Sequence, residues 1–423
     1  MRVSLGGAVS LIRRCAVLFR SALVSKVRYW VKAARDYAIL FTVRFCCAGA
    51  LASANLEITN RREGSFNMYR VAGISFEHMH MLDNLRMVVA HDSCELVGVC
   101  DAQPSRLEDT CSQLALPDDR VFNNWEMCVE KARPDFLVLC PSTGDHALWV
   151  ERLAPFGLPI LIEKPMAASL ADADQMIAAC SRHDTVLAVN WPAVWVPSHA
   201  MAKRLVDQGR IGKVIEVHYY GGNRGPLWHT ADKREVTAED VRRQKPKSWF
   251  YSRSQGGGSM LDYLGYGATL GTWYMDGRRP IEVTAVVDRP AGLDVDEHSI
   301  TIARYEEGLS KFETRWGTYT DPWTHQPQPK CGFVLVGTEG TISSFDYAPT
   351  VRVQDSDHPS GVDLPAEELQ APYQNPIQYF VDCLDHGRDV EGPLSPEVSR
   401  IGQQIVETAY TSAAKGETLP LIG

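Results

Sequence analysis

The chain has 423 residues, and its 43 basic and 52 acidic residues give a formal net charge of −9. This length suits two or three domains, and an apolar share of 45% excludes a collagen-like, low-complexity or wholly disordered chain. Residues 1–67 hold 11 basic and 3 acidic residues, which leaves a net charge of −17 on residues 68–423 and argues against a nucleic-acid partner, because phosphate binding needs a basic face.

Residues 1–67 form a basic extension that we exclude from the fold. Charges interrupt every apolar run before it reaches the roughly 20 residues that span a bilayer, so we expect no membrane anchor. A signal peptide could use residues 37–54 as its apolar region, but Arg44 interrupts this region. A transit peptide would suit the Arg-rich composition. Because neither pattern is well formed, we favour an upstream extension with functional translation from Met68.

The 11 cysteines do not suggest a disulfide framework. The sequence contains no C-x-x-C pair, and a chain of this size rarely depends on disulfides. Cys94, Cys100, Cys140 and Cys180 lie in or beside apolar runs, as small buried side chains do. We therefore expect residues 68–423 to be cytoplasmic.

From residue 69 onward, short apolar runs alternate with segments of helical period. Residues 81–89 place apolar side chains at i, i+1, i+4, i+7 and i+8, which is one helix face. This alternation predicts an α/β domain with a doubly wound parallel sheet. The predicted strands are residues 69–74, 95–100, 135–140, 158–162 and 185–190, and the predicted helices are 81–89, 104–116, 146–153 and 169–181.

Polar residues follow the predicted strands, at the edge where doubly wound sheets bind ligands. Asp101 ends the second strand, where a carboxylate can hydrogen-bond a ribose diol and would repel a 2′-phosphate. It therefore favours NAD over NADP, although it could instead cap the helix that opens near Pro104. The other strand-end residues are Ser75, Ser142, Thr143, Glu163, Lys164 and Asn190.

The loop after the first strand lacks the G-x-G-x-x-G pattern of a dinucleotide site, because Gly73 is the only glycine in residues 73–80. The N-terminal amides of the next helix can still receive a pyrophosphate, although Glu77 is an unfavourable charge there unless it points away. His78 and His80 suggest a metal site, but side chains two apart on a helix diverge, and no third ligand is placed nearby. We therefore predict no metal site.

Four segments carry the motifs of a known family. They are Glu-Lys-Pro at residues 163–165, PDFLVLCPSTGDHALWVERL with Pro141 and His146, AKRLVDQGRIGKVIEV at residues 202–217, and GGGSMLDYLGYGATLGTWYMDG at residues 256–277. In these segments the chain resembles the Gfo/Idh/MocA oxidoreductase family, and the likeness covers about residues 68–420. It implies an N-terminal NAD-binding Rossmann domain at residues 68–192, then a substrate-binding α/β domain at residues 193–423 with an open, mostly antiparallel sheet.

The resemblance also implies roles for single residues. It places Lys164 between nicotinamide and substrate, and its G-G-x-x-x-D-x-x-x-H motif matches Gly257, Gly258 and Asp262 but has Tyr266 at the His position. This substitution, the missing glycine loop, and Trp191-Pro192 in place of Arg-Phe mark a divergent branch. The expected cofactor-binding residues are Gly73, Ser75, Asp101, Pro141, Ser142, His146, Glu163, Lys164 and Asn190.

The chemistry of hydride removal predicts catalytic roles for Lys164, Asp262 and Tyr266. Asp262 and Tyr266 stand four apart, so a helix over residues 261–275 presents both on one face. The hydroxyl proton must leave with the hydride, which requires an acid/base group within hydrogen-bond reach. We expect Tyr266 to accept it, with its pKa lowered by Lys164, and Asp262 to hold the hydroxyl. Alternatively, Lys164 is the base and Tyr266 only fills space.

In the second domain, strands are predicted at residues 213–220, 281–288, 299–305, 311–316, 332–337 and 341–345. The long segment 221–255 contains Trp228, Trp249, Phe250 and Tyr251, whose rings suit the faces of a sugar, or alternatively a packing or oligomer interface. Two helices, near residues 375–384 and 396–415, are expected to cover the sheet or return to the first domain.

We interpret the chain as an NAD-dependent dehydrogenase acting on a hydroxyl of a sugar, cyclitol or glycoside. Two alternatives stay open: a redox-neutral enzyme that cleaves a glycoside through transient oxidation, and a nucleotide-binding regulator that has lost catalysis. The expected partner is a small carbohydrate or polyol, with neither nucleic acid nor membrane. The resemblance further implies a homo-oligomer, a dimer or tetramer.

Overall fold

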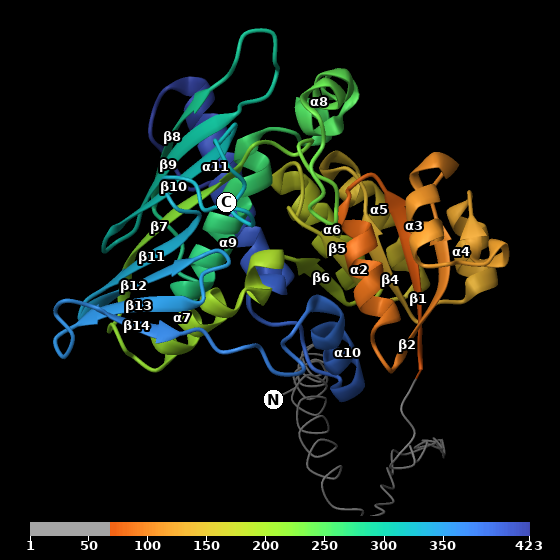
Figure 1. The fold of residues 1–423 in the computed structure, drawn as a ribbon, viewed down its shortest axis with the longest axis horizontal. Helices are drawn as coiled ribbons and strands as arrows, with labels where there is room; N and C mark the ends of the chain where they lie inside the picture. Colours follow the sequence, from red (N-terminus) through yellow and green to blue (C-terminus); the bar gives the residue numbers. More distant parts are fainter. Residues whose placement is uncertain (1–67) are drawn as a thin grey trace, which may run out of the picture. The chain divides into compact units, whose positions relative to one another are not determined.

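A computed structural model describes residues 68–423, all within one compact unit. The predictions for residues 1–67, a basic extension or a targeting segment, lie outside the described residues. Figure 1 shows two sheets, the first with helices on both sides and the second with one face covered by helices. Among residues 68–423, no helix combines the length and apolar character needed to cross a membrane.

The first sheet has six strands in the order β3-β2-β1-β4-β5-β6, and all of its pairings are parallel. The predicted doubly wound sheet is thereby confirmed. The prediction ended β1 two residues early, because Phe76 still pairs with Cys140 of β4. The strands are β1 (Tyr69–Phe76), β2 (Cys94–Cys100), β3 (Val121–Phe122), β4 (Phe136–Cys140), β5 (Ile160–Glu163) and β6 (Leu187–Asn190).

Helices cover both faces of this sheet because its strands are apolar on both sides. Ile74 and Leu137 are buried on the face of α4, α5 and α6, whereas Val71 and Val138 pack on the face of α2 and α10. The predicted helix 104–116 is divided into a 3₁₀ turn, Pro104–Arg106, and a short α3. The helices are α2 (His80–Val89), α3 (Glu108–Gln113), α4 (Trp125–Ala132), α5 (His146–Leu153), α6 (Leu170–Arg182) and α10 (Pro376–His386).

The second sheet has nine strands in the order β14-β13-β12-β11-β7-β10-β9-β8-β15. Only β7 and β10 pair in parallel among these strands, so the predicted mostly antiparallel sheet is confirmed. The prediction missed β13, β14 and β15. The strands are β7 (Val214–Asn223), β8 (Glu282–Asp288), β9 (His298–Arg304), β10 (Leu309–Trp316), β11 (Gly332–Gly337), β12 (Gly340–Phe345), β13 (Thr350–Asp355), β14 (Val362–Pro365) and β15 (Leu419–Pro420).

The helix with the G-G-x-x-x-D motif packs directly on this sheet. It begins with a π-helical turn, Met260–Leu264, and continues as α9, Gly265–Tyr274, so the predicted helix 261–275 is confirmed. A Cβ at Gly267 would lie 2.6 Å from the Tyr219 ring and 2.9 Å from the Phe312 ring, so glycine permits this close approach. The second domain also contains α7 (Pro197–Asp207), α8 (Ala238–Gln244) and α11 (Pro396–Lys415).

The C-terminal helices join the two domains, as the sequence suggested. Phe380 of α10 packs edge-on against Phe136 of the first sheet, with ring centroids 5.5 Å apart. The indole N–H of Trp191, just after β6, donates to the hydroxyl of Ser399 in α11 at 3.0 Å. These contacts connect the C-terminal helices to the first sheet at the start of β4 and just after β6.

The core of the second sheet yields a test of the fold. Leu335 in β11 is fully buried, whereas Leu309 in β10 is half exposed. We expect Leu335→Ala to lower the free energy of unfolding by about 2–5 kcal/mol, because it leaves a cavity. Leu309→Ala should cost less than about 1 kcal/mol. Urea unfolding of both variants measures the difference, and equal losses would contradict the assigned register.

Candidate active site

A cavity of about 230 Å³ lies between the two domains, beyond the carboxyl ends of β5 and β6. It combines charged, amide, imidazole and aromatic side chains, as small-molecule sites do. The first domain contributes His78, His80, Asp83, Asn84, Lys164 and Asn190, and the second contributes Tyr219, Asn223, His229, Lys233, Phe250, Asp262, Tyr263, Tyr266, Trp323 and Tyr347.

An ion pair between the domains brings together two of the predicted catalytic residues. Lys164 Nζ, one residue past β5, lies 2.5 Å from Asp262 Oδ1 in the π-helical turn. Both side chains are about nine-tenths buried, and the indole N–H of Trp316 donates to Asp262 Oδ2 at 3.3 Å. A buried pair of this kind holds both charges in place. It presents an ammonium group and a carboxylate at the cavity wall.

Tyr266 lies at this cavity, but its environment differs from the one we expected. Lys164 Nζ lies 5.3 Å from the centre of the Tyr266 ring, over its face. Burial, together with the Glu163 and Asp262 carboxylates, raises the pKa of the Tyr266 phenol well above its usual value. The expected lowering of this pKa by Lys164 is therefore wrong. Tyr266 stays a neutral phenol at physiological pH and is a poor proton acceptor.

His229 is a candidate acid/base residue that the sequence analysis missed. It lines the cavity, is 7% exposed, and packs against Trp323 with ring centroids 4.5 Å apart. Its Nδ1 atom is buried and has no hydrogen-bond partner among the described residues. Burial lowers the pKa of His229 to about 4, and the Lys233 ammonium contributes. Position in the long segment 221–255 was the only sequence signal for this residue.

His78 and His80 lie close together, contrary to the argument from helical spacing. Their ring centroids are 4.4 Å apart, and with Glu163 they offer three possible ligand atoms, all within 4.8 Å of one another. The argument against a metal site is wrong on both points. Because α2 begins at His80, His78 precedes the helix, and Glu163 at the end of β5 offers a third possible ligand atom.

Glu163 and Asn190, two of the predicted cofactor residues, meet beside this histidine pair. The Glu163 side chain is fully buried, and its Oε1 lies 2.9 Å from Nδ1 of His80. The amides of Asn84 and Asn190 approach Oε2 at 3.5 and 3.4 Å. Burial lowers the pKa of both His78 and His80 well below the ordinary value, so both imidazoles are neutral.

Just after β1, the Glu77 carboxylate is directed toward the loop after β4 and toward Arg106. Its Oε2 accepts the backbone N–H of Ser142 at 2.9 Å, and its Oε1 lies 3.0 Å from the Arg106 guanidinium. An N–H group after β4 and a guanidinium are suitable donors for a phosphate. The residues fit the anionic part of a dinucleotide once Glu77 turns away. Arg106 was not anticipated from the sequence.

Asp101 is placed at the end of β2 as predicted, but internal hydrogen bonds occupy it. Its Oδ2 accepts the N–H of Phe76 and its Oδ1 accepts the N–H of Gln103, both at 2.8 Å. The carboxylate is buried, so it can offer only its remaining acceptor capacity to a ribose. The buried hydroxyl of Thr143, on the loop after β4, has no partner among the described residues and could bond a cofactor.

The remaining predicted cofactor residues do not line the cavity. A Cβ at Gly73 would lie 3.2 Å from Leu85, so this glycine serves the packing of α2 on β1. Ser75 has a φ of 65°, in the left-handed region. Nδ1 of His146 lies 3.2 Å from the carbonyl of Met166, and burial lowers the pKa of His146 to about 4. Pro141 is buried beside them.

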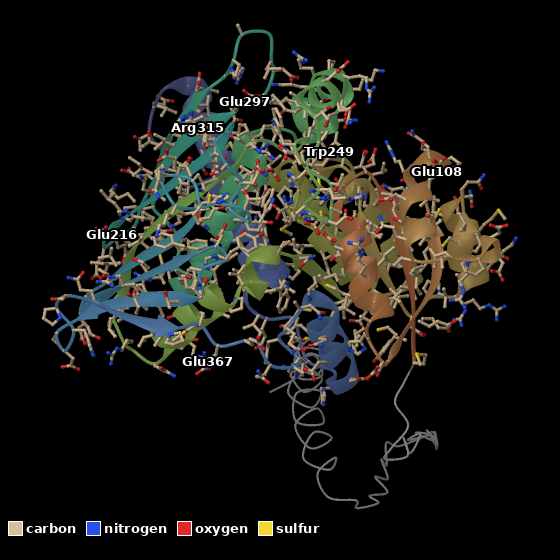
Figure 2. All side chains as sticks on the ribbon, viewed as in Figure 1. Glu108, Glu216, Trp249, Glu297, Arg315 and Glu367 are labelled. Atoms are coloured by element: carbon tan, nitrogen blue, oxygen red, sulfur yellow. The ribbon has the colours of Figure 1, made fainter. Side chains whose placement is uncertain are left out.

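The aromatic residues of segment 221–255 are divided between packing and the cavity. Phe250 lines the cavity and stacks on Trp249 with ring centroids 3.9 Å apart. Trp249 (labelled in Figure 2) donates its indole N–H to the carbonyl of Glu77 at 3.1 Å, which fixes the segment to the first domain. Trp228 and Tyr251 do not line the cavity, which instead contains Trp323.

Comparison with known proteins agrees with this architecture. The chain is 24% identical to D-apiose dehydrogenase of Paraburkholderia graminis over 342 residues, 78% of this chain and 84% of that protein. It is 22% identical to scyllo-inositol 2-dehydrogenase (NAD(+)) of Bacillus subtilis over 341 residues, 74% and 86% of the two chains. A solved oxidoreductase from Agrobacterium radiobacter, in complex with NAD+, L-tartaric acid and magnesium, matches with a TM-score of 0.67 at 19% identity, covering 84% of this chain and 99% of that one.

Two family models account for most of the described chain. The model of the Gfo/Idh/MocA oxidoreductase family, with its NAD-binding Rossmann fold, matches residues 71–191. The model of the Gfo/Idh/MocA C-terminal domain matches residues 199–343. Together these matches span more than half of the sequence. The chain belongs to the Gfo/Idh/MocA family of NAD(P)-dependent oxidoreductases.

Proposed function

We propose that the chain is an NAD-dependent dehydrogenase that oxidises one hydroxyl group of a sugar, cyclitol or glycoside. The observation that carries this proposal is the buried Lys164–Asp262 pair, which lies on a small polar cavity at the strand ends of a Rossmann sheet. Relatives named as apiose and inositol dehydrogenases support the reaction class. Bound NAD would accept the hydride from the carbinol carbon.

The protein's own residues then have to orient the hydroxyl and remove its proton. Lys164 can donate a hydrogen bond to the hydroxyl oxygen, and its positive charge stabilises the alkoxide that develops there. Asp262 keeps the ammonium in position and can accept a hydrogen bond from a neighbouring hydroxyl. Both groups are held by the rigid ends of β5 and the π-helical turn, so little reorganisation is needed.

We assign the proton acceptor to His229. A neutral imidazole with an unpartnered buried Nδ1 can accept a proton, whereas Tyr266 is a neutral phenol and Lys164 is paired with Asp262. In this assignment Tyr266 shapes the cavity and places its ring face under the Lys164 ammonium.

The cavity favours a substrate of about the size of a monosaccharide or cyclitol. Its volume of about 230 Å³ holds one ring, and its amides, imidazoles and carboxylates suit several hydroxyls. Phe250 and Trp323 add aromatic faces for the C–H face of such a ring. We propose that Asp101 selects NAD over NADP by repelling a 2′-phosphate, and that Arg106 and Ser142 hold the pyrophosphate.

We further propose that the protein is cytoplasmic and forms a homo-oligomer through the open face of the second sheet. Val286, Ile302 and Leu309 are exposed on the neighbouring strands β8, β9 and β10, which gives this face an apolar strip. Light scattering of the purified chain would measure the oligomeric state directly.

The first test concerns the ion pair. Wild-type protein is screened for NADH formation from NAD+ with pentoses, hexoses and inositols, and Lys164→Ala and Asp262→Asn are compared with it. We expect both variants to lose about 10²–10³-fold in kcat, because Lys164→Ala removes the charge that stabilises the developing alkoxide and Asp262→Asn removes the carboxylate that keeps this ammonium in position. Lys245→Ala, which breaks the separate Lys245–Glu297 pair, is the matched control and should keep its activity.

The outcomes of this screen separate the alternatives. NAD binding with no turnover on any polyol would favour the regulator. Glycoside cleavage without net NADH would favour the redox-neutral enzyme. Undiminished turnover in Lys164→Ala would refute the proposed role of the pair. Thermal melts of each variant distinguish loss of activity from loss of folding.

The second test is the pH dependence of His229. A base must be deprotonated, and the pKa of His229 is lowered to about 4, so kcat should fall only as the pH drops through about 4. His229→Gln should lower kcat by about 10²–10⁴-fold and lose this dependence. An acidic limb centred near 6.5, or a fully active His229→Gln enzyme, would show that another group takes the proton.

The third test concerns Glu77. Glu77→Gln keeps an oxygen that can accept the Ser142 N–H, but it removes the negative charge from the expected pyrophosphate position. We expect NAD+ to bind about 5–10-fold more tightly, which is roughly 1 kcal/mol. Glu95→Gln, which weakens an exposed pair with Arg120 in the same domain, is the control. Unchanged or weaker binding, measured by fluorescence titration, would contradict this placement of the pyrophosphate.

A further inference from the structure

Three neighbouring side chains have no role in the proposed reaction: His78 and His80, which line the cavity, and Glu163 beside them. His78 lies on the turn between β1 and α2, His80 is the first residue of α2, and Glu163 is the last residue of β5. Their three potential ligand atoms all lie within 4.8 Å of one another. They come from rigid parts of the fold, because the backbone N–H of His78 donates to the carbonyl of Cys140 in β4 at 2.9 Å.

The charge of Glu163 is the second observation. Its side chain is completely buried, and no lysine or arginine of residues 68–423 forms an ion pair with it. The adjacent Lys164 is directed to Asp262 instead, at 2.5 Å. The contacts of Glu163 are the His80 imidazole and the amides of Asn84 and Asn190. Buried carboxylates are normally paired with a cation or coordinate a metal, so this cluster lacks a positive charge.

We propose that His78, His80 and Glu163 bind a divalent transition-metal ion of the Zn²⁺ class beside the substrate cavity. Two imidazole nitrogens and one carboxylate oxygen form a donor set that suits Zn²⁺ or Fe²⁺ and leaves coordination positions open. Mg²⁺ and Ca²⁺ prefer oxygen ligands and do not suit it. The site goes beyond the proposed dehydrogenase, because none of the three residues is needed there for proton or hydride transfer.

The surroundings have the features of an outer ligand shell. The amides of Asn84 and Asn190 approach Glu163 Oε2, which leaves Oε1 directed at His80. Such outer contacts orient metal-binding carboxylates. The amide of Asn190 also contacts the carbonyl oxygen of the Asn84 side chain at 3.2 Å, so the two amides hold each other.

Binding an ion would need only small rearrangements. A tetrahedral ion at about 2.1 Å from each ligand holds the ligand atoms roughly 3.4 Å apart, which rotation of the side chains can reach from the observed spacing. The ion would replace two hydrogen bonds, the 2.9 Å contact of His80 Nδ1 with Glu163 and the 3.2 Å contact of the His80 N–H with His78 Nδ1. Its open positions would face the cavity that both histidines line.

The test measures metal binding by the full-length chain without NAD or substrate, so its failure is separate from failure of the proposed dehydrogenase. Chelator-treated protein is titrated with Zn²⁺, with Co²⁺ as a spectroscopic probe and with Mg²⁺ as the negative control. The chain has 11 cysteines, which can also bind Zn²⁺. The decisive quantity is therefore the number of ions per chain that each substitution removes. We expect His78→Ala, His80→Ala and Glu163→Gln each to bind one ion fewer per chain, or to bind it at least 100-fold more weakly.

Two further variants keep the test independent of folding. Asn84→Ala removes an outer contact and should weaken binding about 10-fold, as substitutions of outer-shell partners commonly do by 10–100-fold. His183→Ala, a partly exposed histidine at the end of α6, should leave binding unchanged. Zn²⁺ should also raise the melting temperature of the wild type but not that of Glu163→Gln. The proposal is overturned if the wild type binds no ion, or if the three ligand variants bind Zn²⁺ as the wild type does.

Discussion

The buried ion pair between Lys164 and Asp262 is the constraint on which the site depends. Taking two charges out of water costs several kcal/mol for each ion, and their attraction offsets this only when the geometry is tight and further hydrogen bonds are made. The pair joins the end of β5 in one domain to the π-helical turn in the other, and Trp316 completes the bonding of Asp262. The two domains must therefore keep one orientation, which the contacts of α10 and α11 provide.

Three other carboxylates near the strand ends are accommodated in different ways. Glu77 is bound by the Ser142 N–H and Arg106, Asp101 is bound mainly by backbone N–H groups, and Glu163 has only imidazole and amide contacts. Residues 68–423 carry a net charge of −17, so their overall field does not attract an anionic cofactor. The cofactor must therefore be attracted by local groups. Arg106 and the N–H of Ser142, which now bind the Glu77 carboxylate, can provide this attraction.

The sequence predicted those features that follow from residue periodicity and family motifs. It failed for features that are determined by side-chain burial or by the local backbone geometry. The period of the apolar runs was enough for five of the six strands of the first sheet but not for the two-residue β3, and the family motifs were enough to locate Lys164 and Asp262. The predicted lowering of the Tyr266 pKa was wrong because this pKa depends on desolvation, which a list of neighbours does not give. The argument about His78 failed because it treated His78 as part of the helix, whereas α2 begins at His80. His229 was missed because segment 221–255 has no regular period.

The contacts of Glu77 show how the first domain can bind a cofactor without losing the wall of the cavity. Its backbone carbonyl accepts the indole N–H of Trp249, while its carboxylate separately accepts the N–H of Ser142. Rotation of the side chain can release Ser142 and Arg106 for a pyrophosphate without breaking the bond to Trp249. Trp249 in turn supports Phe250, which lines the substrate cavity. Glu77 can thus release Ser142 and Arg106 to the pyrophosphate of the cofactor. The residues on the substrate side of the cavity keep their positions.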